Sequence, residues 1–417
     1  MTLKEELEIL RGEPIEVFDG DPMDIPCIET SDAENLCKNP VVSVHMITYN
    51  HEPYIRQAIE GVMMQKTDFE FELVIGEDCS QDKTREICFE YQKKYPDKIR
   101  VLWWHENVSK LGGNSRRVRA RSRGEFIALC EGDDYWIDPL KLQKQVDIMR
   151  RYPNVGICFC GSKIYRSNTG EWSQWNDGSW NSSCVIPSKE YMLYSMFGRN
   201  PYKNFGPEFF QMTATFLARK SLLDKAVSLY ELNQWRTRVG DGKFSMGVGS
   251  LADAYYLSDV VSVYRQTTTG ATVYNAEMGM VDTLIIRLYF LKVIFGLDFY
   301  DAPDRIRRIF VRSVCAYKRR MFGSLKAFGY LYDMLKMKCG RRFLKRSVWY
   351  TVFTALNWSI ISRVGLGVLS RYEAYICSLG ISGGIRKIYL EDASIDLTKR
   401  EIRRTSLIRR IFHALYK

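Results

Sequence analysis

Three carboxylates follow a short apolar run in the first third of the chain. Glu131, Asp133 and Asp134 come directly after FIALC in the segment GEFIALCEGDDYW. Like charges this close repel each other unless a positive charge lies between them. Glu131 and Asp133 are on the same side of an extended segment, where their oxygens can hold a hard divalent cation, Mg²⁺ or Mn²⁺. The predicted metal ligands are therefore Glu131, Asp133 and Asp134. The alternative is an acidic turn before a helix, but Asp138 alone would serve as its N-cap.

Two further acids, Asp78 and Asp241, stand at positions that suit either a role in a binding or catalytic site or the N-cap of a helix. Asp78 ends the run FELVIGED, and an acid at such a strand end accepts hydrogen bonds from a base or ribose in nucleotide-binding folds. It could equally cap a helix that begins near Ser80 or Asp82. Asp241 follows a glycine turn in VGDGK, and by itself this position is typical of a helix N-cap.

Alternating strands and helices are expected to position these acids. Residues 41–160 alternate apolar runs with amphipathic segments of about a dozen residues, which predicts βαβ units, a mostly parallel sheet and helices on both of its faces. Ligands bind such sheets at the carboxyl ends of the strands, beside a change in strand order. Polar clusters fall at three of these ends: Thr48–Glu52, Glu77–Ser80 and Glu131–Asp134.

The rest of the chain shows weaker patterns. Residues 1–40 are polar and acidic, and are expected to form a loosely packed leader. Residues 168–208 are rich in Trp, Asn, Gly and Ser without periodicity, which predicts excursion loops. Residues 209–265 predict further strands and helices, and from residue 275 onward the pattern is helical, amphipathic and increasingly basic.

Charge is distributed unevenly along the 417 residues. Residues 301–417 hold 25 Lys and Arg against 8 Asp and Glu, a net charge of +17, whereas the rest of the chain carries −6. A basic region of this kind indicates an anionic partner surface, either membrane head groups or nucleic acid. Its longest uncharged run, residues 347–362, is 16 residues long, shorter than the roughly 20 that a spanning helix needs. Helices lying in the plane of an anionic bilayer are one interpretation, and solvated helices packed on the preceding domain are the other.

Cysteine usage and the N-terminus favour the cytoplasm. The eleven cysteines are scattered without CxxC pairs, which is typical of a reducing compartment. The start, MTLKEELEIL, is acidic where a signal peptide needs a basic and then an apolar stretch.

Three motifs in order resemble the nucleotide-sugar half of family 2 glycosyltransferases, which have the GT-A fold. They are VSVHMITYNHEPYIRQAIEGVMMQ, FELVIGEDCSQDKT and RGEFIALCEGDDYW. The resemblance runs from about residue 41 to 160, and more weakly to about 270. It implies a GT-A catalytic domain over 41–272, with a nucleotide-sugar half (41–160) and an acceptor half (161–272), between the leader (1–40) and a basic helical region (273–417).

The resemblance also implies roles for individual residues. Thr48 and Asn50 lie in the family's first nucleotide loop, with Glu52 close behind, and Asp78 matches the acid that reads the edge of the base. The segment Glu131–Asp134 stands where the family has its DXD motif. The departure is Glu131, which replaces the first Asp of that motif.

Downstream, the resemblance extends to the expected site of proton transfer. Asp241 resembles the family acid that serves as general base. Tyr264 and Arg265 resemble the YR pair before the loop that closes over the diphosphate. The family often has a His shortly afterwards, and this chain instead has QTTTGAT, with Thr267–Thr269 in that place.

These features together predict an inverting, metal-dependent glycosyltransferase. Its donor would be a nucleotide-diphosphate sugar, expected to be a UDP-sugar, and its acceptor a hydroxyl of a glycan or lipid-linked molecule in surface polysaccharide assembly at the inner face of the cell membrane. A nucleotidyltransferase on a related sheet would need a glycine-rich first loop, which TYNHEPYI lacks. A nucleic-acid-binding protein would need stacking platforms or a helix-turn-helix, so no nucleic acid is expected as a partner. A catalytically silent transferase fold is a further alternative, because of Glu131 and the missing His.

Overall fold

The computed structural model describes residues 2–11, 13–17, 22–108, 113–175, 182–197, 212–237, 240–267 and 276–296. These residues all belong to the first of two compact units, residues 1–306. The predictions for the basic segment 301–417 and for Thr268 and Thr269 lie outside the described residues.

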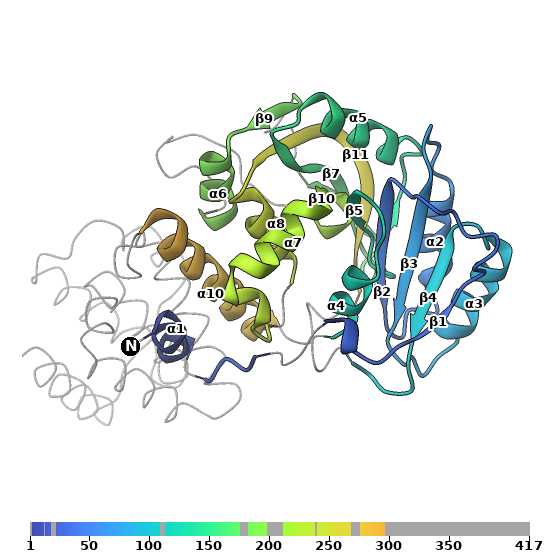
Figure 1. Ribbon diagram of the computed structural model, residues 1–417, viewed down its shortest axis with the longest axis horizontal. Helices are drawn as coiled ribbons and strands as arrows, with labels where there is room; N and C mark the ends of the chain where they lie inside the picture. The colour runs from blue at the N-terminus through green and yellow to red at the C-terminus, as the bar shows by residue number, and fades with distance from the viewer. Residues whose placement is uncertain are drawn as a thin grey trace, which may run out of the picture. The chain divides into compact units, whose positions relative to one another are not determined.

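A mixed β-sheet organises the described chain (Figure 1). Its strands are β1 (Ile28–Thr30), β2 (Val42–Thr48), β3 (Phe71–Glu77), β4 (Ile99–Trp103), β5 (Phe126–Leu129), β6 (Tyr135–Trp136), β7 (Val155–Arg166), β8 (Glu171–Trp175), β9 (Cys184–Ile186), β10 (Leu217–Arg219) and β11 (Asp253–Gln266). The order is β1-β4-β3-β2-β5-β10-β7-β11-β6, with β8 beside β7 and β9 beside β11. Strands β4, β3, β2 and β5 are mutually parallel, as are β7 and β11. The parallel centre of the sheet agrees with the sequence prediction.

Helices cover both faces of this sheet. They are α1 (Leu3–Arg11), α2 (Ile55–Met63), α3 (Thr84–Lys94), α4 (Gly113–Ala120), α5 (Lys141–Arg151), α6 (Ser188–Phe197), α7 (Lys220–Leu229), α8 (Asp241–Gly249) and α10 (Ala276–Phe295), with short 3₁₀ turns η1 (Pro22–Asp24), η3 (Thr213–Thr215) and η4 (Glu231–Gln234). Within the described residues, no helix combines the length and apolar character needed to cross a bilayer.

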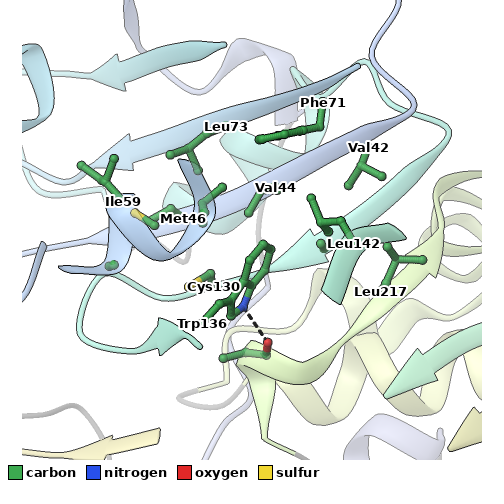
Figure 2. Close-up of a cluster of buried hydrophobic side chains, with 14 of the residues drawn as sticks. Val42, Val44, Met46, Ile59, Phe71, Leu73, Cys130, Trp136, Leu142 and Leu217 are labelled. Atoms are coloured by element: carbon green, nitrogen blue, oxygen red, sulfur yellow. Dashed lines mark hydrogen bonds between the residues drawn. The ribbon is translucent and has the colours of Figure 1, made fainter. Parts of the chain in front are cut away.

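Strand periodicity decides which side chains meet which helices. In β2, Val42, Val44 and Met46 point to one face and join the main apolar cluster with side chains of α2, α3 and α5 (Figure 2). On the opposite face, Val74 and Leu102 pack against Val118 of α4. Because both faces are buried, these strands read as continuous apolar runs, which is why they were recognisable in the sequence.

A tryptophan in β6 anchors the segment after β5 to the 3₁₀ turn η3. The indole Nε1 of Trp136 donates a hydrogen bond to the carbonyl oxygen of Ala214 at 2.8 Å (Figure 2). The ring itself is almost completely buried in the main cluster. The loop that contains the three acids is therefore anchored at its far end.

A buried ion network supports the sheet near the amino end of β3. The fully buried carboxylate of Glu72 accepts hydrogen bonds from Arg123 Nη2 at 2.7 Å, Arg100 Nη1 at 3.1 Å and Ser43 Oγ at 2.6 Å. Burial alone would raise the pKa of Glu72, but the hydrogen bonds from Arg123 and Ser43 and the charge of Arg100 outweigh burial and lower it.

We expect Glu72→Gln to lower the free energy of unfolding at pH 7 by about 3 kcal/mol, because it leaves Arg123 without its buried counter-charge and Arg100 with Glu29 alone. Since the folded pKa of Glu72 is below its unfolded value of about 4.3, the carboxylate stabilises the fold above that pH and ceases to do so as the pH falls through the folded pKa. Urea unfolding of both proteins between pH 7 and 3 should therefore show a difference that is constant near neutrality and shrinks in acid. Glu90→Gln, in an exposed pair with Arg56, is the control and should change the midpoint little. An unchanged midpoint for Glu72→Gln would contradict the expectation.

Two segments are more regular than the sequence indicated. Residues 168–208 were expected to be loops, but β8, β9 and α6 lie within the described part of this range. The leader was expected to pack loosely, yet β1 extends the sheet beside β4, and Arg11 of α1 forms a buried ion pair with Asp282 of α10 at 2.9 Å. The domain boundary at residue 40 remains a prediction.

Candidate active site

The strand order places a change of direction between β2 and β5. From β2 the chain moves outward through β3 and β4, and then returns to β5 on the other side of β2. Thr48 is the last residue of β2, and Glu131 follows β5 by two residues. The N–H of Gly132 donates to the carbonyl of Ile47 at 3.0 Å, which joins the two strand ends. This is the position at which open α/β sheets bind ligands.

Two buried polar atoms face Gly132 without partners. Thr48 Oγ1 and His51 Nδ1 are shielded from solvent and have no hydrogen-bond partner. A Cβ atom added at Gly132 would lie 2.7 Å from Thr48 Oγ1 and 2.8 Å from His51 Nδ1. Unpaired buried polar groups are costly, so their presence here points to a site prepared for a polar ligand.

We expect Gly132→Ala to disturb this position more than an ordinary glycine substitution would. The added methyl group must displace Thr48 or His51, which we expect to cost about 1–3 kcal/mol of unfolding free energy. The control is Gly242→Ala, where the nearest atom would be 3.9 Å away, so its unfolding midpoint should not fall. Thermal unfolding of the two variants measures the difference, and equal midpoints would show that the contact at Gly132 is not tight.

The acids after β5 form a cluster of like charges that repel one another. Burial and the charges of Asp133 and Asp241 raise the pKa of Glu131 to about 8. Asp133 is about one fifth exposed, and its Oδ2 lies 3.9 Å from Nε2 of His51. Burial lowers the pKa of His51, although Asp133 opposes this shift, so the imidazole adds no full positive charge near neutral pH.

The donor set at this cluster fits a divalent cation. Glu131 and Asp133 offer hard oxygen ligands, and a cation between them would relieve the repulsion that raises the pKa of Glu131. In the part of the chain that the structure describes, no three His, Cys, Asp or Glu side chains are arranged as a metal site. Mg²⁺ sites often use only one or two carboxylates and complete their coordination with water and substrate phosphates. A carboxylate pair is therefore the expected protein contribution.

Asp134 differs from Glu131 and Asp133 because it accepts a hydrogen bond from the backbone of β11. Its Oδ1 accepts the backbone N–H of Arg265 at 2.8 Å, while Oδ2 is buried without a partner. Burial and the charges of Asp133 and Glu131 raise the pKa of Asp134 well above its ordinary range. Direct metal binding by Asp134 remains a prediction, and the observed contact gives it a role in joining the acidic loop to β11.

Arg265 lies in a cage made by two aromatic rings and an amide. Its guanidinium carbon is 4.6 Å from the ring centre of Tyr54 and 5.0 Å from that of Tyr135. Its Nη2 donates to Gln57 Oε1 at 2.6 Å. The cage holds a positive charge at the carboxyl end of β11, close to the acidic cluster.

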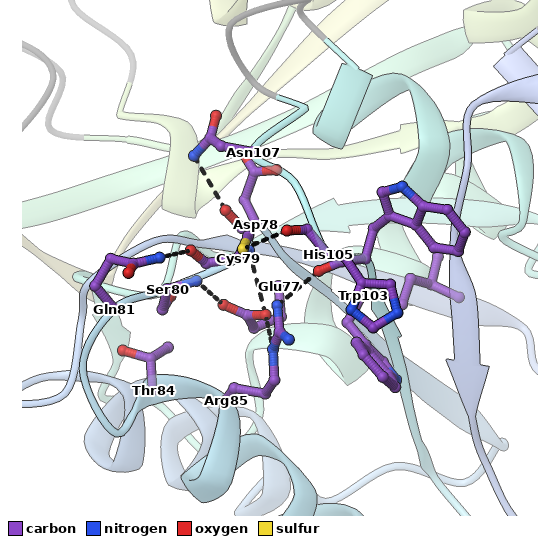
Figure 3. A network of polar contacts seen from close by, with 12 residues as sticks. Glu77, Asp78, Cys79, Ser80, Gln81, Thr84, Arg85, Trp103, His105 and Asn107 are labelled. Atoms are coloured by element: carbon purple, nitrogen blue, oxygen red, sulfur yellow. Dashed lines mark hydrogen bonds and ion pairs between the residues drawn. The ribbon is translucent and has the colours of Figure 1, made fainter.

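A second polar network follows β3 (Figure 3). The carboxylate of Glu77 accepts hydrogen bonds from the N–H of Ser80 at 2.6 Å and from Arg85 Nε. Asp78 is almost fully buried, and its Oδ1 accepts the N–H of Val108 at 2.7 Å. Asn107 also donates to the carbonyl oxygen of Asp78. Asp78 thus holds residues 107 and 108 against the strand end, and base recognition by this acid stays a prediction.

Asn50 and Glu52 contact the segment that immediately precedes α3. Asn50, with φ of 55°, accepts the N–H of Gln81 on Oδ1 at 2.8 Å. Glu52 accepts the N–H of Lys83 on Oε2 at 3.2 Å. These contacts position the loop, and direct nucleotide contacts from both residues stay predictions.

The structure adds residues that sequence reasoning missed. His51, Gln57 and Tyr135 all lie at the site, and although each falls inside one of the quoted motifs, none of them was assigned a role from the sequence. His51 could have been found from the sequence, because it lies in TYNHEP between Asn50 and Glu52, which were both predicted to contact the nucleotide. Gln57 carried no signal, because its importance depends on Arg265, which lies 208 residues away.

Comparison with known proteins agrees with this geometry. Residues 43–226 match the family model Glycosyl transferase family 2. An uncharacterized protein of Mycobacterium tuberculosis is 40% identical over 145 residues, which are 35% of this chain and 42% of that protein. Human dolichyl-phosphate beta-glucosyltransferase is 31% identical over 134 residues, 30% of this chain and 41% of that protein. The matches thus span about two fifths of these relatives' lengths.

The solved structures show only distant similarity. Staphylococcus aureus TarS 1–349 in complex with UDP has 17% identity and a TM-score of 0.46, and the match covers 75% of this chain and 90% of that one. The family match and the strand order confirm the predicted GT-A class of α/β fold, with a largely parallel centre between helices.

Proposed function

Because the chain carries a family 2 glycosyl transferase domain over residues 43–226, we propose that it moves a sugar from a nucleotide-diphosphate sugar to an acceptor hydroxyl. The observation that carries this proposal is the meeting of Glu131, Asp133 and Thr48 at the adjoining carboxyl ends of β2 and β5. That position combines acids, unpaired polar atoms and a nearby arginine, as binding of a charged diphosphate requires. A UDP-sugar is the proposed donor.

Glu131 and Asp133 are the proposed ligands of Mg²⁺ or Mn²⁺. When bound, such a cation would neutralise charge that grows on the departing diphosphate. The polypeptide itself supplies the remaining groups: the hydroxyl of Thr48 and the guanidinium of Arg265 for anionic oxygens, and Asp78, Asn50 and Glu52 around the nucleotide.

Asp241 is the proposed general base. It is the first residue of α8, its side chain is exposed, and its charge acts on Glu131 across the site. In the proposed step the acceptor oxygen bonds to the anomeric carbon while the bond from that carbon to the phosphate oxygen breaks. The hydroxyl proton passes to the Asp241 carboxylate, and the nucleoside diphosphate leaves with the bonding electrons. A single displacement of this kind inverts the anomeric centre.

The proposed acceptor is a glycan or a lipid-linked molecule in surface polysaccharide assembly. Two observations support a membrane setting: the excess of positive charge in residues 301–417, and the name of the human relative, which contains dolichyl-phosphate. We propose a cytoplasmic enzyme that works peripherally at the inner face of the membrane.

The test is a screen of nucleotide sugars against the full chain. UDP-glucose, UDP-N-acetylglucosamine, UDP-galactose and GDP-mannose would each be added with MnCl₂ or with EDTA, while thermal unfolding and release of nucleoside diphosphate are followed. At about 100 times its dissociation constant, the correct donor should stabilise the fold by about 2.7 kcal/mol. We expect this response with MnCl₂ and its loss with EDTA. No stabilisation and no turnover by any donor would refute the proposal.

A further inference from the structure

An exposed aromatic pair lies on the hairpin formed by β7 and β8. Trp172 of β8 is directly opposite Tyr165 of β7, and their ring centres are 4.7 Å apart at an interplanar angle of 39°. Trp172 is nevertheless 56% exposed. A cross-strand aromatic contact explains why the two rings touch, but it leaves much of the larger ring open to solvent.

The pair is continuous with the candidate active site through the strand register. In the parallel ladder between β7 and β11, Tyr165 is the partner of Arg265, so the two side chains share a face of the sheet. On that side Arg265 packs against Tyr135. Burial is the main cause of the raised pKa of Tyr135, and Tyr165 contributes to the same shift. Arg265 in β11 and Trp172 in β8 are separated by two strand spacings, from β11 to β7 and from β7 to β8, which is about 10 Å.

The surroundings of the pair are polar. Lys163, two residues before Tyr165, is exposed and lies on the same face of β7. Arg166 and Ser173, which are joined by a hydrogen bond at 3.4 Å, follow Tyr165 and Trp172 in their strands and therefore lie on the other face of the hairpin. A single wide ring beside an exposed lysine is unlike the contiguous apolar patches that mark protein–protein interfaces. It suits a ligand with one apolar face and many hydroxyls.

We propose that Trp172 and Tyr165 form a stacking subsite for a pyranose ring of the acceptor glycan. This inference rests on the proposed glycosyl transfer. A pyranose presents C–H groups on its faces, which pack on an aromatic ring, while its hydroxyls at the edge bond to polar neighbours such as Lys163. Stacking two strands away from Arg265 would hold one sugar of an acceptor chain and direct the chain's end toward the acids.

The test compares acceptor binding with donor binding in the full chain. Trp172→Thr keeps a residue with a high strand preference but removes the flat ring, and Trp172→Tyr restores a ring. Leu229→Ala is the matched control, because Leu229 is also 56% exposed but lies on α7. Cellohexaose, maltohexaose and chitohexaose are titrated calorimetrically in the presence of UDP and MnCl₂, and thermal unfolding checks that each variant is folded.

We expect at least one hexaose to bind the unmodified chain, and Trp172→Thr to weaken that binding about tenfold. Trp172→Tyr should recover most of the loss, and Leu229→Ala should bind as the unmodified chain does. Equal binding by Trp172→Thr, or no binding of any hexaose, would overturn the subsite. Failure of the proposed function is distinguishable, because it would appear as the absence of stabilisation by every nucleotide sugar in all four proteins.

Discussion

Asp133→Asn is expected to lower the rate of nucleotide-sugar turnover by about 100-fold or more. Removing one group that acts on the charge developing in a transition state typically costs this much. Asp133 is partly exposed at the junction of β2 and β5, and its charge is one cause of the raised pKa of Glu131. The amide keeps the shape of the side chain but removes half of the carboxylate pair that is proposed to hold the cation.

The same substitution should not weaken the fold. Because Asp133 repels Glu131 and Asp134, its neutralisation lowers the pKa of both neighbours toward ordinary values and relieves a cost in the folded state. Loss of activity together with an equal or higher unfolding midpoint is the signature of a functional charge, since a structural residue would show the opposite.

Two measurements check this expectation. Initial rates are measured at saturating MnCl₂, and the rise in unfolding temperature caused by MnCl₂ is compared between the unmodified chain and Asp133→Asn. Asp147→Asn, on the exposed side of α5, is the control and should keep both responses. If Asp133→Asn retained more than half of the activity, Asp133 would have no role in binding the cation.

Asp241→Asn is expected to reduce the turnover number by about 10²–10⁴-fold, which is the usual contribution of a general base. Asp241 is exposed at the start of α8, and its charge is one of the causes of the raised pKa of Glu131, after burial and Asp133. Asparagine can still accept the N–H of Gly242, as Oδ1 of Asp241 does at 2.8 Å, so the helix start should be preserved.

Measuring donor binding distinguishes the proposed role of Asp241 as a general base from the proposed role of Asp133 as a cation ligand. The dissociation constant of the nucleoside diphosphate with MnCl₂ should stay within about threefold of the unmodified value, because the proposed base touches the acceptor. Turnover is measured as donor hydrolysis, in which water takes the place of the acceptor hydroxyl. Asp224→Asn on α7, paired with Lys220, is the control. A marked loss of nucleotide affinity in Asp241→Asn would assign that acid to the donor instead.

Much of the fold was predictable because buried parallel strands have a strong local signature. The runs that became β2, β3, β4 and β5 are buried on both faces, are mostly apolar and end in polar loops, so their type and order could be read from single segments. The segment around β8 and β9 was not predictable for the opposite reason. These are short strands with mixed composition, and they exist through pairing with β7 and β11.

The sequence by itself determined the chemistry: a set of carboxylates at strand ends, a basic region after residue 300, and the family motifs. Only the tertiary structure decided which side chains from distant segments come into contact. Asp134 meets Arg265 across 131 residues, and Gln57 meets Arg265 across 208. Strand order and register create these partnerships, and no local pattern encodes them, because each requires two distant segments to be packed before the side chains can meet.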